Sequence, residues 1–440
     1  MDFLTNTAAF VAVLGLMIFF HEFGHFITAK AFGMRVFIFS FGFGPRLLGV
    51  KWGDTDLRVS AIPLGGYVKL EGEPEDHLSE DTSRLGDGKD FGGRPRWQRF
   101  LVYLAGPLMN GVLTVGVLTA LYMVGFQVEA SLYDRPVVGA VAAGSPAEQA
   151  GLRPGDEIVT IDGGLVATWE DAQYAILIRP DAAVRLGLRR GGEEREVVVR
   201  STSRDDDKVG TIGVSPLVRV GLIVPGSPAE QAGLRADDAI LRIGDTAVAS
   251  FGEIPGLVAA SAGQPLAFEV WRAGQPLRLT ITPRDDGQGQ RVGIGPKMVV
   301  KKFSLFPAAA EALRWSWNMT RQTFEVLGRL LTGQISPKTM MGPLGIAKAS
   351  GDAARGGIGP LFYLVAVISL QIGILNLFPL PPLDGGHLAI LAAESVARHD
   401  FSMNVKAWLM NAGAMVLFLL IGLVLYSDLS KTSLLGRYLP

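Results

Sequence analysis

Apolar positions in this chain gather into windows without Asp, Glu, Lys or Arg, at residues 3–20, 100–128, 356–383 and 407–427. A helix needs about 20 apolar residues to cross the hydrocarbon core of a bilayer, and each window reaches or nearly reaches that length. The pattern predicts four membrane-spanning helices. A signal peptide is not expected, because the first window lacks a basic flank before it and a small-residue cleavage site after it.

Outside these windows the composition is that of a water-soluble protein. The 440 residues include 41 Lys and Arg, 42 Asp and Glu, and no cysteine. The near-neutral balance offers no basic surface, so no nucleic-acid partner is expected. The absence of cysteine excludes disulfides and cysteine-ligated metals. The chain therefore combines segments embedded in a lipid bilayer with soluble domains.

The distribution of basic residues predicts the orientation of the spans. Three arginines crowd the start of the second window, and Arg398 and Lys406 lie between the third and fourth windows. Connections rich in Lys and Arg remain on the cytoplasmic side. With four spans, both termini and the segment 129–355 face the opposite side. In a bacterium this is the periplasm, and the membrane is the inner membrane.

The soluble segment contains an internal repeat. Residues 144–153 read Gly-Ser-Pro-Ala-Glu-Gln-Ala-Gly-Leu-Arg and recur unchanged at 226–235. The match then weakens, and Asp237 stands where the first copy has Gly155, so the turn there is expected to differ. Two copies are too few for a solenoid, and the repeat predicts two small domains in tandem.

The first apolar window leads into His21-Glu22-Phe23-Gly24-His25, an H-E-x-x-H motif. Positions i and i+4 share one face of a helix, so both imidazoles can bind one zinc while Glu22 lies beside the water that the metal activates. Packed polar residues are the alternative, but ionisable groups inside a membrane are costly and usually functional. The motif predicts a catalytic zinc site.

A catalytic zinc takes three protein ligands, so a third must come from elsewhere. Asp384 directly adjoins the third window, after a run with three prolines that must interrupt a helix. Broken backbone at membrane depth occurs only where protein or a water-filled cavity surrounds it, which indicates a site rather than a plain span. His387 follows closely, and either a direct role or packing near the site is open for it.

The H-E-x-x-H motif together with the N-x-x-P-x-P-x-L-D-G run resembles the site-2 protease family of intramembrane zinc metalloproteases. The resemblance covers nearly the whole chain. It implies that His21, His25 and Asp384 bind zinc, that Glu22 is the general base and proton shuttle, and that Asn376 binds substrate or the oxyanion. The repeated segments resemble PDZ domains of bacterial proteases, which bind peptides at a sheet edge.

Other segments are candidates for substrate handling. Residues 36–44 and 57–70 read as strands or hairpins punctuated by prolines, and Gly42 and Gly44 resemble the family's membrane-reentrant β-loop. An ordinary cytoplasmic hairpin is the alternative. Asn110 lies in an element that also resembles the family, and it either bonds across helices near the site or only packs. Residues 306–331 predict an amphipathic helix on the outer membrane face or against the PDZ pair.

The predicted fold is a polytopic α-helical membrane protein with four transmembrane helices, membrane-associated β-hairpins and two tandem periplasmic PDZ (α/β) domains. The expected segments are 1–32 (first span), 33–98 (cytoplasmic or reentrant β region), 99–127 (second span), 128–214 and 215–298 (PDZ domains), 299–355 (amphipathic region), 356–390 (third span), 405–427 (fourth span) and 428–440 (periplasmic tail).

The resemblance implies cleavage of the transmembrane segments of single-span membrane proteins in sigma-E envelope-stress signalling. The implied substrates are an anti-sigma factor after a first periplasmic cut and remnant signal peptides. The PDZ pair is expected to meet a peptide or periplasmic partner and to exclude untrimmed substrates. The alternative is a membrane-anchored PDZ scaffold with an inactive metal site, against which the intact Glu22 and Asp384 argue. A transporter is a weaker alternative, because the spans show no paired repeat.

Overall fold

The computed structural model describes residues 2–72, 89–204, 209–285, 289–336 and 341–431. The chain divides into two compact units, which are considered separately. The membrane unit comprises Met1–Phe126, Lys302–Glu325 and Met340–Pro440, and the repeat unit comprises Gln127–Lys301 and Val326–Thr339.

The helices of the membrane unit include every predicted span. They are α1 (Asp2–Ala31), α2 (Arg96–Val124), α8 (Leu305–Leu331, which continues into the repeat unit), α9 (Pro343–Arg355), α10 (Ile358–Asn376), α11 (Asp384–Ala397) and α12 (Met403–Lys431). Among the described residues, four stretches are long and apolar enough to cross a membrane: Leu4–Ala31, Arg96–Val124, Ile358–Asn376 and Met403–Tyr426. Many large apolar side chains of α12 are exposed, as a lipid-facing helix requires.

Helices α1, α2 and α10 pack closely because small residues stand at their contacts. Val13 and Met17 of α1 share a buried cluster with Leu113 of α2 and Val365 of α10. A Cβ atom added to Gly24 would lie 2.3 Å from the carbonyl oxygen of Ala105, so the backbones of α1 and α2 approach too closely for a side chain there. This contact lies within the H-E-x-x-H turn and brings α2 directly against it.

The helix of the third expected span is interrupted, as the prolines of its sequence predicted. Within the expected range 356–390, α10 ends at Asn376 and α11 begins a new helix at Asp384. The prolines of the intervening run cannot donate to a helical ladder, and they separate the two helices completely. At the far end of α12, Asp428 accepts hydrogen bonds from the first backbone N–H groups of α9, which attaches these two helices to each other.

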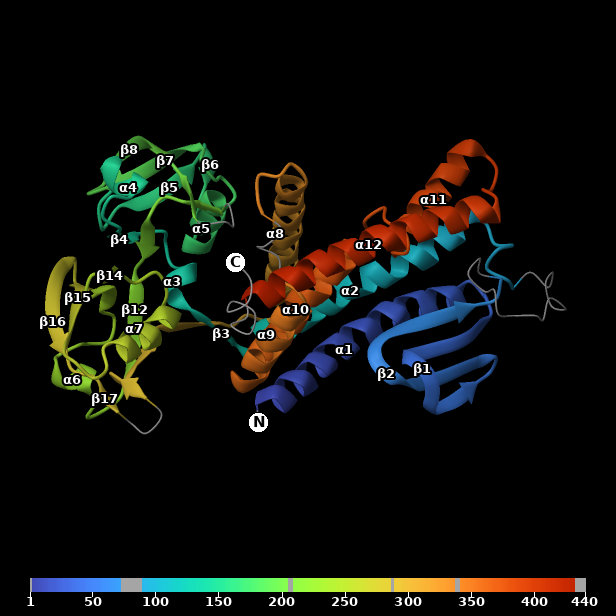
Figure 1. Ribbon diagram of the computed structural model, residues 1–440, viewed down its shortest axis with the longest axis horizontal. Coiled ribbons are helices and arrows are strands. Elements are labelled where there is room, and N and C mark those ends of the chain that lie inside the picture. The colour runs from blue at the N-terminus through green and yellow to red at the C-terminus, as the bar shows by residue number, and fades with distance from the viewer. Residues whose placement is uncertain (1, 73–88, 205–208, 286–288, 337–340, 432–440) are drawn as a thin grey trace. The chain divides into compact units, whose positions relative to one another are not determined.

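The segment between α1 and α2 forms one long antiparallel hairpin, β1 (Val36–Trp52) with β2 (Thr55–Leu70), which lies beside α1 (Figure 1). Pro45 and Pro63 were expected to interrupt the strands, yet both strands continue through them. Residues 38–41 of β1 pair with residues 66–69 on one side and with residues 56–59 on the other, and the register also shifts on either side of Phe43. Irregular pairing accommodates proline because the missing N–H then falls at a bulge rather than in a regular ladder.

Helix α8 was expected on the outer membrane face or against the PDZ pair, and that position stays a prediction. Within the membrane unit, its Ala308 and Ala312 are buried in a cluster with residues of α2 and α10. Thr323 also exchanges hydrogen bonds with Gln371 of α10. Small residues of α8 thus meet the other helices of the membrane unit, whereas its large apolar side chains Phe306, Leu313 and Trp317 remain exposed.

The repeat unit contains two copies of one β-rich fold. The first copy has β4 (Val138–Val141), α4 (Pro146–Gln149), β5 (Glu157–Ile161), β6 (Gly164–Leu165), α5 (Trp169–Leu177), β7 (Ala183–Arg190), β8 (Glu193–Arg200), β9 (Thr202–Arg204), β10 (Val209–Thr211) and β11 (Val214–Pro216). The second has β12 (Val218–Ile223), α6 (Pro228–Gln231), β13 (Ala239–Ile243), β14 (Thr246–Ala247), η3 (Phe251–Glu253), α7 (Ile254–Ala260), β15 (Leu266–Arg272), β16 (Gln275–Ile281), β17 (Arg284–Asp285), β18 (Gln290–Arg291) and β19 (Ile294–Pro296). Short elements β3 (Phe126–Glu129), α3 (Ala130–Tyr133) and β20 (Met298–Lys301) flank them.

The two copies use the same local contacts. Ser145 and Ser227 cap α4 and α6, and a buried aspartate in each copy receives two hydrogen bonds from an arginine. The turn at Asp237 does not differ as expected: φ is +70° there and +92° at Gly155, and both N–H groups donate to the equivalent strand. Aspartate is among the few residues that tolerate this left-handed backbone.

Candidate metal centre

Helix α1 supplies two of the three expected metal ligands. His21 and His25 lie one helical turn apart and are 9% and 8% exposed, and their Nε2 atoms are 3.3 Å from each other. Asp384, the first residue of α11, meets them with one oxygen at 3.1 Å from His21 Nε2 and the other at 3.4 Å from His25 Nε2. Within the described part of the chain, these three form the group whose ligand atoms all lie within 4.8 Å of one another.

Hydrogen bonds at the far side of each ring orient the two imidazoles. His25 Nδ1 lies 2.8 Å from the carbonyl oxygen of Val102, an acceptor, so Nδ1 carries the hydrogen and Nε2 keeps its lone pair. The side-chain nitrogen of Asn110, fully buried on α2, lies 3.2 Å from His21 Nδ1, while its Oδ1 has no hydrogen-bond partner among the described residues. A half turn of this amide exchanges the two atoms; with Oδ1 toward the ring, Asn110 would accept from Nδ1–H and leave Nε2 of His21 for the metal.

The backbone of α2 at Gly106 lies directly against the two imidazoles. A Cβ atom at this position would lie 2.2 Å from His25 Nε2 and 2.9 Å from His21 Cε1. Any larger residue would therefore clash with the two imidazole rings. Gly106 begins the family-like element that ends at Asn110, but its contact with the two imidazoles was not predicted, because a glycine inside an apolar window gives no signal of what it faces.

The loop before α11 positions Asp384. The chain turns back so tightly that a Cβ atom on Gly385 would lie 2.2 Å from the carbonyl oxygen of Phe378. On Gly386 a Cβ atom would lie 2.4 Å from the backbone nitrogen of Pro381. The two glycines after Asp384 are thus needed for this loop to fold against the start of α11.

Glu22 lies between the ligands in the sequence and next to the hairpin in space. A Cβ atom on Gly66 of β2 would lie 3.0 Å from Glu22 Cγ, so the second strand passes close to this carboxylate. Gly66 was also missed, since nothing in a strand pattern marks the residue that faces a helix. The hairpin therefore brings a β-strand to the side of the H-E-x-x-H turn.

Of the remaining candidate residues, one lies close to the ligand atoms and the others do not. Asn376, the last residue of α10, comes to 3.3 Å from His21 Nε2 through its side-chain amide. Gly42 and Gly44 lie in β1 with positive φ, against Ile62 of β2, and are not in contact with the ligand atoms. His387 stacks on Tyr103 at 4.6 Å and is not part of the three-ligand group, so the structure favours packing for it.

The donor set fits zinc. Two imidazole nitrogens and one carboxylate are a usual ligand set of catalytic zinc sites, which keep a fourth position open. The Nε2 atoms of both rings face the carboxylate of Asp384, and hydrogen-bond partners at Nδ1 hold the rings in this orientation.

Comparisons with known proteins agree with this geometry. The profile of Peptidase family M50 matches residues 9–420. The chain is 33% identical to "Regulator of sigma-E protease RseP" of Escherichia coli (strain K12), over 98% of this chain and 100% of that protein. It is 31% identical to "Protease RseP" of Yersinia pestis, with the same coverage, and 30% identical to a "Putative zinc metalloprotease" of Vibrio cholerae, over 98% and 99%.

A solved PDZ domain of an SdrC-like protein from Listeria monocytogenes matches 19% of this chain and 90% of that chain, with 23% identity and a TM-score of 0.18. The family assignment rests on the whole-chain matches alone. Their extent and identity settle it: the chain belongs to peptidase family M50 and is a zinc metalloprotease.

Proposed function

We propose that this protease cleaves substrates within the membrane, with His21, His25 and Asp384 as its zinc ligands and Glu22 as its general base. The observation that carries this proposal is the convergence of the three ligand atoms within 4.8 Å. Two of them belong to the apolar stretch Leu4–Ala31, which is long enough to cross a bilayer. A peptide bond must therefore reach this site at membrane depth.

Each side chain of the site has a separate role. When bound, zinc polarises the scissile carbonyl and acidifies the attacking water. Glu22 takes the proton of that water and delivers it to the nitrogen of the leaving amine. Asn376 lies beside His21 and donates a hydrogen bond to the substrate carbonyl as negative charge develops there. Asn110 and the carbonyl of Val102 hold the imidazoles in the orientation that binding requires.

The hairpin supplies a way to hold the substrate. A transmembrane helix hides its amides in its own hydrogen bonds, so it must be extended before it is cut. Residues 38–41 of β1 pair on both edges, with residues 56–59 on one side and 66–69 on the other. In this described sheet, residues 66–70 of β2, which include Gly66, pair on one side only. The close approach of Gly66 to Glu22 supports docking of an extended substrate along this sheet.

The membrane topology and the substrates form the finer part of the proposal. Four spans, two tandem periplasmic PDZ domains and periplasmic termini follow from the charge pattern and the repeat. The relatives' names support a role in sigma-E regulation in a bacterial inner membrane. The substrates are then single-span membrane proteins, namely an anti-sigma factor after a first periplasmic cut and remnant signal peptides, while the PDZ pair takes a peptide or periplasmic partner.

Substitution of the general base tests the catalytic assignment. We expect Glu22→Gln to lower cleavage of a single-span model substrate about 10²- to 10⁴-fold, the usual contribution of general acid–base catalysis. The variant should still contain about one zinc per chain, since glutamine leaves the three ligands in place. Equal turnover by the two proteins would overturn the proposal and favour the scaffold with an inactive metal site.

Deletion of residues 138–296 tests the role of the repeat unit. If this unit excludes untrimmed substrates, the shortened chain should cleave a full-length substrate that the intact chain rejects. The matched measurement is cleavage of the trimmed substrate, which both chains should process. Continued rejection of the full-length substrate by an otherwise active shortened chain would contradict the filter.

A further inference from the structure

A second cluster of buried polar groups lies in the membrane unit outside the metal centre. Helices α2, α11 and α12 line a cavity of about 320 Å³. Its polar wall includes Arg99, Glu394 and Lys406, and its apolar wall includes Leu391, Met403 and Met410. None of these residues has a role in the proposed reaction, although α11 also carries Asp384.

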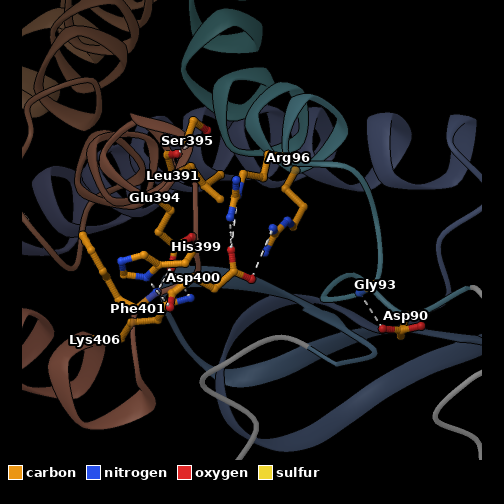
Figure 2. Close-up of polar contacts among 11 residues, drawn as sticks. Asp90, Gly93, Arg96, Leu391, Glu394, Ser395, His399, Asp400, Phe401 and Lys406 are labelled. Atoms are coloured by element: carbon orange, nitrogen blue, oxygen red, sulfur yellow. Dashed lines mark hydrogen bonds and ion pairs between the residues drawn. The ribbon is translucent and has the colours of Figure 1, made fainter. Parts of the chain in front are cut away.

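Glu394 presents an unpaired carboxylate oxygen in this cluster. The residue is 0% exposed, and its Oε1 atom accepts from the backbone N–H of Phe401 at 2.8 Å and from Lys406 Nζ at 2.7 Å (Figure 2). No group of the described residues donates a hydrogen bond to Oε2. A buried carboxylate oxygen without a hydrogen-bond donor costs free energy. A ligand in this cavity is therefore expected to donate an N–H group to it.

Arg99 supplies the complementary group. It is 7% exposed, and within the described part of the chain its Nε atom has no hydrogen-bond partner. Its Nη2 forms a long ion pair with Asp400 at 3.8 Å. Asp400 is bound more closely by Arg96, at 2.5 Å (Figure 2). The guanidinium therefore retains a donor for an anion, and Lys406 on the same wall adds a second positive charge.

The position of the cavity narrows the class of ligand. The stretches Arg96–Val124 and Met403–Tyr426 both begin here, so the cavity lies where hydrocarbon meets polar headgroups. A ligand at this level must combine an N–H-bearing cation for Glu394, an anion for Arg99 and alkyl carbon for the methionines. We propose that the cavity binds an aminophospholipid of the phosphatidylethanolamine type, with its ammonium on Glu394 Oε2 and its phosphate on Arg99 and Lys406.

Lipid chemistry offers a close control for this proposal. Phosphatidylcholine has the same charges, but its quaternary ammonium has no N–H to donate, and phosphatidylglycerol has no cation. The purified full chain in detergent would be titrated with short-chain forms of the three lipids and with free phosphoethanolamine, and binding followed by native mass spectrometry. We expect phosphatidylethanolamine to bind about 10-fold or more tightly than phosphatidylcholine, the effect of one hydrogen bond to a charged group.

Two variants localise the binding. Glu394→Gln should reduce the preference for phosphatidylethanolamine over phosphatidylcholine, and Ala407→Phe should fill the cavity without changing its charges. Val405→Phe is the matched control, because Val405 is 44% exposed on the same helix and does not line the cavity. Ala407→Phe keeps the test decisive if Glu394→Gln fails to fold.

The outcomes separate the possible occupants. Preference for phosphatidylethanolamine that is lost in Ala407→Phe and kept in Val405→Phe supports the proposal. Equal binding of the ethanolamine and choline lipids by the unaltered chain overturns it. Free phosphoethanolamine binding as tightly as the lipid would also overturn it, because the occupant would then be a soluble zwitterion and not a membrane lipid.

Discussion

Helix α11 carries a buried carboxylate near each end, and the two have opposite surroundings. At its first residue, Asp384 faces the imidazoles of His21 and His25. Near its other end, Glu394 faces the ammonium group of Lys406 at 2.7 Å. Imidazoles are neutral when they act as ligands, so the first carboxylate lacks a compensating charge until a cation joins it, whereas the second has one in the chain itself.

This difference indicates which buried carboxylate depends on a metal for its compensating charge. Asp384 faces two imidazoles that are neutral as ligands, so a bound cation stabilises it. Glu394 has its charge balanced by Lys406 and joins two helices, and only its second oxygen lacks a donor among the described residues.

The largest effect is expected at Gly106. In Gly106→Ala the added methyl would lie 2.2 Å from His25 Nε2, the atom that is expected to bind zinc. We expect zinc content below about one tenth of a zinc per chain and a loss of activity of at least about 10²-fold, the loss that even an outer partner of a metal ligand can cause. Zinc analysis and cleavage of a single-span substrate measure both.

Gly111→Ala is the matched control, on the same helix. A Cβ atom there meets no atom within 4 Å, so zinc content and activity should be retained. Full zinc content in Gly106→Ala would show that the metal does not lie between the two imidazoles and would contradict the ligand assignment.

Breaking the ion pair of Glu394 with Lys406 should lower the stability of the protein and leave its zinc content unchanged. Lys406→Met leaves Glu394 buried without its cation, and a broken buried pair costs about 3 to 5 kcal/mol. Denaturation of the purified chain in detergent measures the loss, while zinc content should be unchanged. The double variant Lys406→Met with Glu394→Gln should recover most of it, and no recovery would mean that Lys406 acts through other contacts.

Substitution of Asn110 is expected to have a smaller effect on zinc binding at the metal centre. Asn110→Leu removes the acceptor for His21 Nδ1–H, and loss of such an outer partner weakens zinc affinity about 10- to 100-fold. Competition with a chelator of known affinity measures the change. Asn110→Asp keeps an acceptor and should retain tight binding, so equal weakening by both variants would argue against this hydrogen bond.

The sequence predicted the parts of this contrast that depend on local spacing. The four-residue interval of His21 and His25 places them on one helix face, and the return of charge after an apolar window singled out Asp384. Both arguments use only the helical repeat and the cost of charge in a membrane. Zinc and the protease class followed from the same residues and agree with the family assignment.

What the sequence missed depends on contacts between distant segments. Gly66 and Gly106 matter because of the side chains that they face, and no local pattern encodes this. The pairing of Glu394 with Lys406 joins two helices across a loop. The fold shows the same limit: amphipathicity predicted α8, but not that its small residues Ala308 and Ala312 would pack against α2 and α10.

The smallest effect is expected at Asp400, the exposed member of the cluster near Glu394. A hydrogen bond from Arg96, with smaller contributions from Arg99 and Lys406, holds the pKa of Asp400 below its ordinary value, while partial burial acts in the opposite direction. A carboxylate with a lowered folded-state pKa stabilises the protein above its unfolded pKa of about 4, and this stabilisation is lost as the pH falls through the lower folded value. Because the side chain is 51% exposed, the contribution should be below about 1 kcal/mol.

Melting temperatures of the native chain and of Arg96→Gln should therefore differ slightly at pH 7 and converge toward pH 3. A difference that grows in acid would have the wrong sign for this ion pair and would place the effect of Arg96 elsewhere.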